Sequence, residues 1–331
     1  MIYVNILVTG GAGYIGSHVV KEILKKGHKP FILDNFSKGH KEAIAGGEII
    51  VGDLKNKEFI DRIFQDYKFD SVIHLAADSL VGESVERPDK YYQNNLIGSI
   101  NLLEAMKKSN INKLVFSSTA AVYGDAQEIP IIENSLTEPK NPYGRSKLFF
   151  EEILADYDQS FNFKYISLRY FNASGADPDG NIGEDHDPET HLIPIVLKTA
   201  LGKREKLEIY GTDYDTRDGT CIRDYIHVND LARAHLLAVE ALAEGSDSNI
   251  YNLGSGTGYS VKEVIETARK VTDKNISAEP SERRPGDPPV LIASSAKIKE
   301  DLDWQPKYDD LNTIISTAWK WHNNNPDGFN D

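Results

Sequence analysis

The stretch Thr9-Gly10-Gly11-Ala12-Gly13-Tyr14-Ile15-Gly16 follows a short apolar segment and leads into a run with helical spacing. Glycines at positions 10, 13 and 16 suit a tight turn, a close approach to a pyrophosphate, and a helix packed directly on a strand. Free N–H groups at the start of such a helix bind phosphate. The stretch therefore predicts a dinucleotide-binding turn, although a simple strand-to-helix turn would also explain the glycines.

An acidic residue in the second predicted strand completes this pattern. Asp34 ends that strand and follows Gly16 at close to the expected spacing of about 20 residues. A carboxylate there accepts hydrogen bonds from both ribose hydroxyls and repels a 2′-phosphate, which predicts NAD rather than NADP. Lys38 and Lys41 follow closely and are able to neutralise a phosphate. Asp53 fits either a contact with the adenine or a solvated turn.

Short apolar runs alternate with helical periods from residue 3 to residue 169, as in a parallel sheet with crossover helices. One long helical stretch is expected to end near Lys108, and another to run from Pro142 to about Gln159. The expected fold is α/β, a doubly wound Rossmann-like parallel sheet with ligands at the carboxyl ends of its strands. The expected strands are residues 5–9, 30–34, 48–51, 71–75, 113–117 and 165–169.

The composition changes after Phe171, where Gly, Asp and Pro become dense and the elements become short. This change predicts a second, smaller mixed α/β domain. The apolar run 228–242 and the strand-like residues 249–253 indicate a return to the first domain. The predicted division assigns residues 1–171 and about 222–256 to the NAD-binding domain, and about 172–221 and 257–331 to a substrate-binding domain.

Charge and cysteine content exclude several classes of protein. The chain has 37 Lys and Arg against 51 Asp and Glu, a formal net charge of −14. It therefore lacks the positive field that nucleic acids and anionic membranes require. No apolar run approaches the roughly 18 residues of a membrane helix, and the N-terminus has no targeting pattern. The single cysteine, Cys221, forms no internal disulfide, which predicts a reducing, cytoplasmic setting.

The segment Asn141-Pro142-Tyr143-Gly144-Arg145-Ser146-Lys147 is typical of a helix start, with Asn as N-cap and Pro at the first helical position. Tyr143 and Lys147 are four residues apart and share one helix face. An ammonium, a helix N-terminus and a nicotinamide cation all lower a phenol pKa, so Tyr143 is predicted as a general base. Ordinary helices also carry this spacing, and the prediction depends on where the helix lies.

Three hydroxyl residues end the fifth predicted strand, within Ser117-Ser118-Thr119-Ala120-Ala121-Val122-Tyr123-Gly124. A hydroxyl at that strand end is able to hydrogen-bond the reacting alcohol and the tyrosine oxygen together. Ser117, Ser118 and Thr119 all qualify, and these residues alone do not decide among them.

With its glycine triplet, strand-end hydroxyls and Tyr-x-x-x-Lys in this order, the whole chain resembles the extended short-chain dehydrogenase/reductase family, and within it the UDP-sugar 4-epimerases. The resemblance implies NAD-dependent interconversion of UDP-galactose and UDP-glucose through a 4-keto sugar, in a homodimer. It also rests on the segments Leu33-Asp34-Asn35, Val81-Gly82-Glu83-Ser84, Tyr92-Gln93-Asn94-Asn95, Arg169-Tyr170-Phe171-Asn172, Arg223-Asp224-Tyr225-Ile226-His227-Val228 and residues 283–287.

The resemblance also implies roles for single residues. Tyr143 is the expected base, Lys147 holds the cofactor ribose and tunes Tyr143, and Thr119 is the catalytic hydroxyl. Residues expected at NAD are Gly10, Gly13, Tyr14, Ile15, Gly16, Asp34, Asn35, Ser37, Asp53, Leu54, Ala76, Asn95, Tyr143, Lys147 and Phe171. Residues expected at the UDP-hexose are Thr119, Tyr143, Asn172, Leu192, Arg223, Tyr225, Arg284 and Asp287.

The expected arginines have a physical reason and an alternative. A planar guanidinium suits a diphosphate and supplies local positive charge on an acidic protein. A surface salt bridge explains either arginine equally well. Two positions depart from a frequent family pattern, because His191 stands where many members have Asn and Ser79 where some have Lys.

Rival activities are weighed by single positions. An NDP-sugar 4,6-dehydratase needs an Asp–Glu pair after the strand-end Thr, where this chain has Ala120 and Ala121. Leu291 stands where the family controls access of an N-acetyl group and is intermediate in bulk, so UDP-GlcNAc and pentose substrates stay open. A non-catalytic NAD or UDP-sugar sensor would not need Thr119, Tyr143 and Lys147 together.

A cluster of acids and histidine, Glu184-Asp185-His186-Asp187, lacks a recognised metal spacing. It is interpreted as a solvated loop, and no metal is predicted.

Overall fold

A seven-stranded parallel sheet forms the centre of the molecule. The computed structural model describes residues 4–284 and 286–329, and the sheet order is β10-β6-β5-β4-β1-β2-β3. The order reverses between β1 and β4, which is where doubly wound sheets bind ligands. The predicted fold class is confirmed. The strands are β1 (Asn5–Thr9), β2 (Lys29–Asp34), β3 (Glu48–Val51), β4 (Ser71–His74), β5 (Lys113–Ser117), β6 (Lys164–Tyr170) and β10 (Asn249–Leu253).

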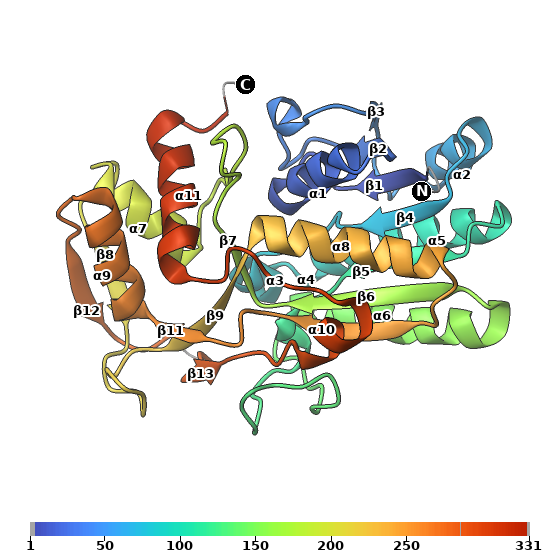
Figure 1. Ribbon diagram of the computed structural model, residues 1–331. Helices are drawn as coiled ribbons and strands as arrows, with labels where there is room; N and C mark the ends of the chain where they lie inside the picture. Colours follow the sequence, from blue (N-terminus) through green and yellow to red (C-terminus); the bar gives the residue numbers. More distant parts are fainter. Residues whose placement is uncertain (1–3, 285, 330–331) are drawn as a thin grey trace.

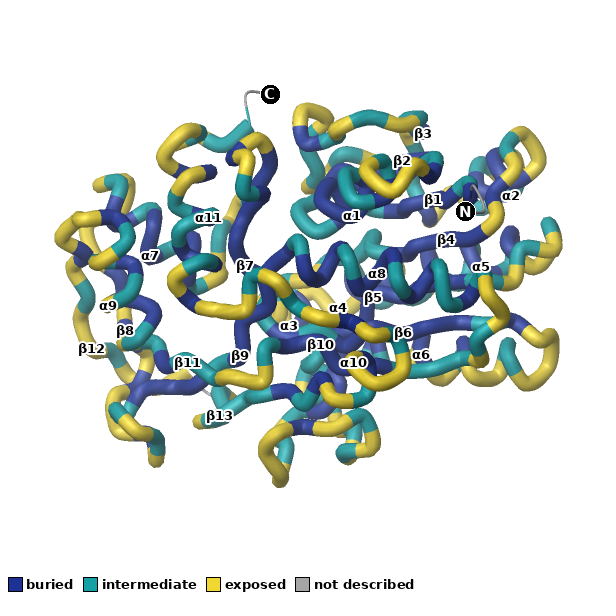
Figure 2. The backbone as a smooth tube through the Cα atoms, viewed as in Figure 1, coloured by how far each residue is buried: buried dark blue, intermediate teal, exposed yellow. Residues whose placement is uncertain are grey.

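Helices cover both faces of this sheet (Figure 1). In β1, Ile6 and Val8 belong to the buried cluster that includes α1 and α8, whereas Leu7 belongs to the cluster that includes α2, α5 and α6. Successive side chains of a strand point to opposite faces, so a strand buried on both sides has a continuous apolar sequence. Figure 2 shows this burial along the central strands. The helices are α1 (Tyr14–Lys25), α2 (Lys57–Asp66), α5 (Gly98–Lys108), α6 (Pro142–Phe161) and α8 (Val228–Ala243).

The long helical stretch expected before Lys108 is broken into several pieces. Arg87 has φ −128° and ψ 60°, outside the helical region, because it precedes Pro88, which begins a new helix. A π-helical turn then follows and carries the buried Asn95. The predicted helical stretch ending at Lys108 is therefore confirmed, with a break at Arg87. The pieces are α3 (Val81–Glu86), α4 (Pro88–Tyr91), η2 (Tyr92–Ile97) and α5.

A second unit surrounds β9 (Ile222–His227), which pairs with β7 (Asn172–Ser174), β11 (Gly258–Ser260) and β13 (Val290–Leu291). Helices α7, α9 and α11 of this unit gather at the end of the molecule opposite α2 (Figure 1). They share a buried cluster with the strand pair β8 and β12. The remaining elements are η1 (Lys41–Ala43), η3 (Ala120–Val122), α7 (Leu192–Ala200), β8 (Leu207–Tyr210), α9 (Val261–Thr272), β12 (Ala278–Ser281), α10 (Ala296–Leu302) and α11 (Leu311–Asn324).

The chain passes between the two units more than once. β10 lies in the large sheet beside β6, whereas β9, at the start of the predicted return, lies in the second sheet. The division into domains stays a prediction. Pro285, within the 283–287 segment of the family resemblance, lies outside the described residues. Among the described helices, none is both long and apolar enough to cross a lipid bilayer.

Of the three glycines at positions 10, 13 and 16 in the turn between β1 and α1, two are required for steric reasons. Gly10 has φ +71°, and a Cβ there would lie 2.7 Å from the backbone nitrogen of Ala76. A Cβ on Gly16 would lie 2.1 Å from the carbonyl oxygen of Gly10. A Cβ on Gly13 would meet the same oxygen at 3.4 Å, an ordinary contact. Gly13 is therefore free of this constraint within the protein itself.

Replacing Gly16 with Ala is expected to destabilise the protein by about 1–3 kcal/mol, because α1 has to move away from the turn to accommodate the methyl group. The measurement is the free energy of unfolding in urea. Gly82→Ala is the matched control, since a Cβ at Gly82 on α3 meets nothing within 4 Å. Equal stability of the Gly16 and Gly82 variants would contradict the steric argument.

Candidate active site

The three hydroxyls at the end of β5 have different partners. The Nδ1 of His235 lies 2.9 Å from the carbonyl of Leu231, so its Nε2 is left to accept from the hydroxyl of Ser117 at 2.8 Å. Ser118 donates to Glu151. Thr119 accepts from the backbone N–H of Ala121 at 3.1 Å, and its hydroxyl lies close enough to the phenol of Tyr143 to lower the pKa of that phenol. The geometry thus selects Thr119, which the residues alone left undecided.

Tyr143 is held at this strand end by the start of α6. Asn141 accepts from the backbone N–H of Gly144 at 2.8 Å and caps the helix, with Pro142 in its first turn. Gly144 permits close packing on η3, because a Cβ there would lie 2.6 Å from the carbonyl oxygen of Ala121. The predicted helix start is therefore confirmed, and it places Tyr143 against Thr119.

Burial raises the pKa of Tyr143, and its hydrogen bond with Thr119 acts in the opposite direction. The predicted lowering of the phenol pKa includes a bound nicotinamide cation and stays a prediction, whereas the protein alone shows the effect of burial. The physical reason is that the ring is almost completely removed from solvent, which disfavours the phenolate. Positive charge from a bound ligand is needed to reverse this effect.

Lys147 lies one helical turn further along α6 and is also buried. Its Nζ donates to the carbonyl oxygen of Ser117 at 2.8 Å and lies 4.8 Å from the centre of the Phe116 ring. Burial lowers the pKa of Lys147 to about 7, although the charge of Glu151 acts in the opposite direction. The amine therefore sits at the end of β5, beside the Thr119 and Tyr143 pair.

A buried ion pair supports this site and was not predicted from the sequence. Arg169 donates to Glu151 through Nε at 3.1 Å and through a terminal nitrogen at 2.5 Å. It also donates to the hydroxyl of Tyr123 at 2.9 Å. The available signal was the spacing of Tyr143, Lys147 and Glu151, which places all three on one face of α6.

His74 forms a second unpredicted network at the point where the sheet order reverses. Its Nδ1 is 2.7 Å from the hydroxyl of Thr9, and its Nε2 is 2.7 Å from that of Ser99. Burial lowers the pKa of His74 to about 3, so the ring is neutral and uses one nitrogen as donor and the other as acceptor. The network ties the ends of β1 and β4 to α5.

The turn after β1 fits a dinucleotide. No side chain caps the start of α1, so its first N–H groups are left for a phosphate. Asp34 accepts from the backbone N–H of Ala12 at 3.0 Å and from that of Phe36 at 2.8 Å. Each carboxylate oxygen keeps a further acceptor position, as two ribose hydroxyls require. The adenosine half of NAD therefore has suitable partners here.

The other residues expected at NAD lie on several elements of the large sheet and its helices. Asn35 donates to Asp53 at 3.1 Å and accepts from the backbone N–H of Ser37 at 3.0 Å. Asn95 bridges the backbone of Asp78 and the hydroxyl of Ser146. The rest lie as follows: Gly13, Tyr14, Ile15 and Gly16 at the start of α1, Gly10 against Ala76, Leu54 buried after β3, and Phe171 buried after β6.

Of the residues expected at the UDP-hexose, Thr119 and Tyr143 lie at the end of β5, and the other six lie in the second unit. Asn172 on β7 is the register partner of Tyr225 on β9. Tyr225 belongs to the buried cluster of the second unit, and Leu192, the first residue of α7, packs against that cluster. Arg284 donates to Asp287 at 2.9 Å, and Arg223 has a terminal nitrogen 3.6 Å from that carboxylate. In the protein without ligand, both arginines therefore form ion pairs with Asp287, as the salt-bridge interpretation of these residues requires.

The catalytic group and the arginine group are separate within the described residues. No hydrogen bond or ion pair of the described chain joins Thr119, Tyr143 or Lys147 to Arg223 or Arg284. A substrate that spans both groups is needed to connect them.

The acidic loop after β7 differs from its predicted state. The side chain of Glu184 is only 4% exposed, and the Nδ1 atoms of His186 and His191 lie 3.0 and 2.8 Å from its Oε1. The interpretation of residues 184–187 as a solvated loop is therefore wrong for Glu184. The acid is buried because its partners come from the same loop and because the Nε1 of Trp321 donates to its carbonyl oxygen.

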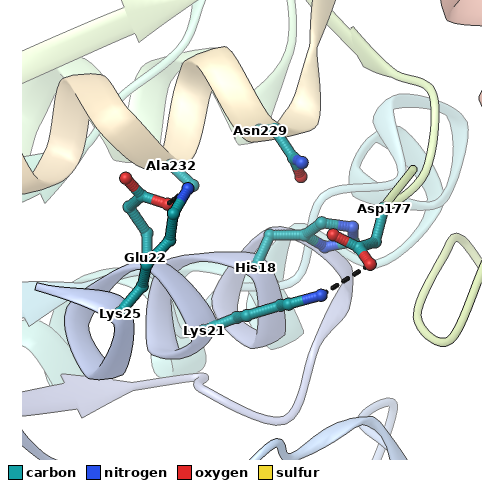
Figure 3. A pocket seen from close by; sticks show the side chains of 7 residues that line it. All are labelled: His18, Lys21, Glu22, Lys25, Asp177, Asn229 and Ala232. Carbon is teal, nitrogen blue, oxygen red and sulfur yellow. Dashed lines mark hydrogen bonds and ion pairs between the residues drawn. The ribbon is translucent and has the colours of Figure 1, made fainter. Parts of the chain in front are cut away.

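A small cavity of about 50 Å³ lies between α1, α8 and the start of this loop (Figure 3). Lys21 points toward Asp177 across it, with a 2.6 Å ion pair. None of the residues expected at NAD or substrate lines this cavity. The ion pair between Lys21 and Asp177 joins α1 to the loop. The residues predicted to bind NAD and substrate lie outside this cavity.

A glycine turn lies at the reversal of the sheet, an acid ends β2, and a buried hydroxyl, phenol and amine lie beside β5. This arrangement fits a dinucleotide-dependent enzyme. The chain belongs to the NAD dependent epimerase/dehydratase family, whose profile matches residues 6–254.

Similar proteins cover nearly the whole chain. A UDP-glucose 4-epimerase of Halalkalibacterium halodurans is 53% identical over 98% of this chain and 97% of its own length. A crystal structure of UDP-glucose 4-epimerase from Brucella ovis in complex with NAD is 48% identical, with a TM-score of 0.93, covering 95% of this chain and 97% of that one. One from Bifidobacterium longum in complex with NAD+ and UDP is 39% identical, with a TM-score of 0.93, covering 98% and 100%.

Replacing Lys147 with Met is expected to change how stability depends on pH in cofactor-free protein. A lowered pKa means that the folded protein binds this proton less tightly than the unfolded chain does. The charged amine therefore costs stability below about pH 7, and that cost fades as the pH rises toward the unfolded value. Urea unfolding should show a larger gain from Lys147→Met at pH 6.5 than at pH 9. Parallel pH profiles of the two proteins would refute the buried-amine interpretation.

Proposed function

We propose that this chain is a UDP-glucose 4-epimerase, which interconverts UDP-galactose and UDP-glucose through a transient 4-keto sugar with NAD as bound hydride carrier. The observation that carries the proposal is the convergence of three buried side chains, Thr119, Tyr143 and Lys147, at the end of β5. The near full-length identity to UDP-glucose 4-epimerases supports it.

In the proposed cycle, Tyr143 takes the proton of the sugar 4-hydroxyl as the C4 hydrogen leaves as hydride. Thr119 hydrogen-bonds that hydroxyl and the phenol oxygen, which fixes their distance. Lys147 binds the nicotinamide ribose. When bound, NAD supplies a reversible hydride acceptor and a positive charge that lowers the pKa of Tyr143. The ketone would turn over within the site. When its opposite face regains the hydride, Tyr143 would return the proton to the C4 oxygen, so that C4 is inverted and Tyr143 is regenerated.

The turning step requires that the enzyme hold the nucleotide tightly and the hexose loosely. We assign the nucleotide to Asn172, Leu192, Arg223, Tyr225, Arg284 and Asp287 in the second unit. Arg284, with a side chain 58% exposed, is free to exchange its contact with Asp287 for a diphosphate oxygen. Binding energy then comes from the part of the substrate that does not react.

A dual specificity that includes UDP-GlcNAc is the second candidate. Leu291 on β13 packs against the buried cluster of Val122 and Phe171, and Val122 lies three residues after Thr119. This contact supports a role for its side chain near the sugar end of the proposed site. Leucine is intermediate in bulk, so an N-acetyl group is not rejected by size alone. Dehydration is disfavoured, because Ala120 and Ala121 offer no acid or base beside Thr119.

We also propose a cytoplasmic homodimer. Burial of the lone Cys221 and the lack of a second cysteine suit a reducing compartment. Phe149 on α6 and Ile97 on η2 are exposed apolar side chains on elements that pack together, and Tyr92 stacks on Phe149. An apolar surface across α6 and η2 supports association of two copies.

The function is tested by incubating the pure protein with UDP-galactose, and separately with UDP-GlcNAc, and analysing the sugars formed. UDP-glucose should form from UDP-galactose, and UDP-GalNAc from UDP-GlcNAc only if specificity is dual. Tyr143→Phe should lower turnover by about 10²- to 10⁴-fold while UDP binding is retained. Tyr157→Phe is the control, because that hydroxyl on the same helix bonds Glu104 instead.

Two results would contradict this proposal. One is unchanged turnover in Tyr143→Phe. The other is a purified protein that holds no NAD and gains no activity when NAD is added.

Replacing Phe149 with Glu is expected to halve the mass measured by light scattering, because a charge would be buried at the proposed dimer surface. Leu136→Glu is the control, since Leu136 is exposed in a loop outside α6 and η2. A wild-type protein that is monomeric at micromolar concentration would refute the dimer.

A further inference from the structure

The loop between β7 and α7 brings together four residues that have metal-ligating side chains. They are Glu184, His186, Glu189 and His191, and their ligand atoms all lie within 4.8 Å of one another. The Nδ1 of His191 is 2.8 Å from Glu184 Oε1 and 3.0 Å from Glu189 Oε1. The Nδ1 of His186 is 3.0 Å from Glu184 Oε1. Two imidazole nitrogens and two carboxylates therefore point at a common centre.

One oxygen of this cluster is buried without a hydrogen-bond donor. The Glu189 side chain is 4% exposed, and its Oε1 accepts from the backbone N–H groups of Thr190 and His191. Within the described residues, its Oε2 has no hydrogen-bond partner. The Nδ1 of His186 is 3.9 Å from it, beyond hydrogen-bond distance. Buried carboxylate oxygens rarely lack a partner, so this atom indicates a missing ligand.

The charge of the cluster points to the sign of that ligand. Among the described residues, Glu184 and Glu189 form ion pairs with His186 and His191 and with no lysine or arginine. Once both imidazoles have become neutral ligands, the two carboxylates contribute two negative charges in a largely buried place. A divalent cation would neutralise both.

We propose that Glu184, His186, Glu189 and His191 bind one divalent transition-metal ion of the zinc and cobalt class. Imidazole nitrogen with carboxylate oxygen is a donor set that these ions accept. Metal–ligand bonds of about 2.1 Å separate tetrahedral ligands by about 3.4 Å. The ligand atoms of the cluster lie between 2.8 and 4.8 Å apart, so small side-chain movements bring them to that spacing. Each ring that is an imidazolium in the metal-free protein releases its Nδ1 proton to solvent as the metal binds, and a ring that is already neutral moves that proton to Nε2, so both coordinate as neutral imidazoles through Nδ1.

Four protein ligands leave no position for a substrate, so the ion has a structural role. It would fasten the loop between two parts of the proposed active site. His191 is followed directly by Leu192, the first residue of α7, and the ring of His186 contacts that of Tyr14 edge-on at 6.1 Å. Tyr14 begins α1 and donates to the carbonyl of Gly175 at 2.7 Å. The ion thus fixes the loop against the cofactor-binding turn.

The test is a titration of the untagged protein with Co²⁺ after chelator treatment and dialysis. One equivalent should bind with visible ligand-field absorption and be displaced by Zn²⁺, which should also raise Tm. Glu189→Gln and, separately, His186→Asn should weaken binding by at least about tenfold. Glu205→Gln is the matched control, because Glu205 is an exposed acid outside the loop.

Several outcomes would overturn the proposal. One is the absence of stoichiometric Co²⁺ uptake by the wild-type protein, a result that does not depend on any variant. Another is equal affinity of the wild type and of both ligand variants, which would place the ion elsewhere. Circular dichroism and the urea midpoint of each metal-free variant identify weak binding that comes only from misfolding. Epimerase assays are not needed, so the metal site and the enzymatic function are tested independently.

Discussion

Direct contact between backbone segments, at positions where a Cβ does not fit, is the constraint on which this structure depends. Gly10 lies against Ala76 where the sheet order reverses, and Gly16 lies against Gly10, so α1 begins directly at the end of β1. Gly144 lies against Ala121 in the same way and brings α6 onto η3. The first contact forms the cofactor turn, and the last places Tyr143 beside Thr119. Two helix starts are thus aimed at one edge of the sheet.

Burial then controls the protonation of the site. It raises the pKa of Tyr143 and lowers that of Lys147 to about 7. It also lowers the pKa of His74 to about 3. The permanent charge of Arg169 is retained inside the protein because Glu151 compensates it at hydrogen-bond distance. The protein alone therefore holds a neutral phenol in a dry setting, and the charge that ionises it has to arrive with the ligand.

The loop from residue 175 to residue 191 links these parts. At one end Lys21 of α1 pairs with Asp177, and at the other the Glu184 cluster lies against Tyr14. Both contacts reach the helix that carries the cofactor turn, while the loop itself leads into α7 of the second unit. The position of the second unit relative to the cofactor is therefore set partly by charged and aromatic side chains of one loop.

The local sequence pattern determined the bounds of several strands and the positions of the cofactor turn and of one helix start. β1, β3, β5 and β10 have the bounds that their apolar runs predicted, and the glycine turn, Asp34 and the start of α6 were readable because each depends on neighbours along the chain. The choice of Thr119 over Ser117 was not readable from the residues alone, since it depends on His235, which is 118 residues from Ser117. The burial of Glu184 depends in the same way on Trp321, 137 residues away. Periodicity records which face of an element is buried, but the partner and the protonation state of a polar side chain are decided only when distant segments exclude water from it.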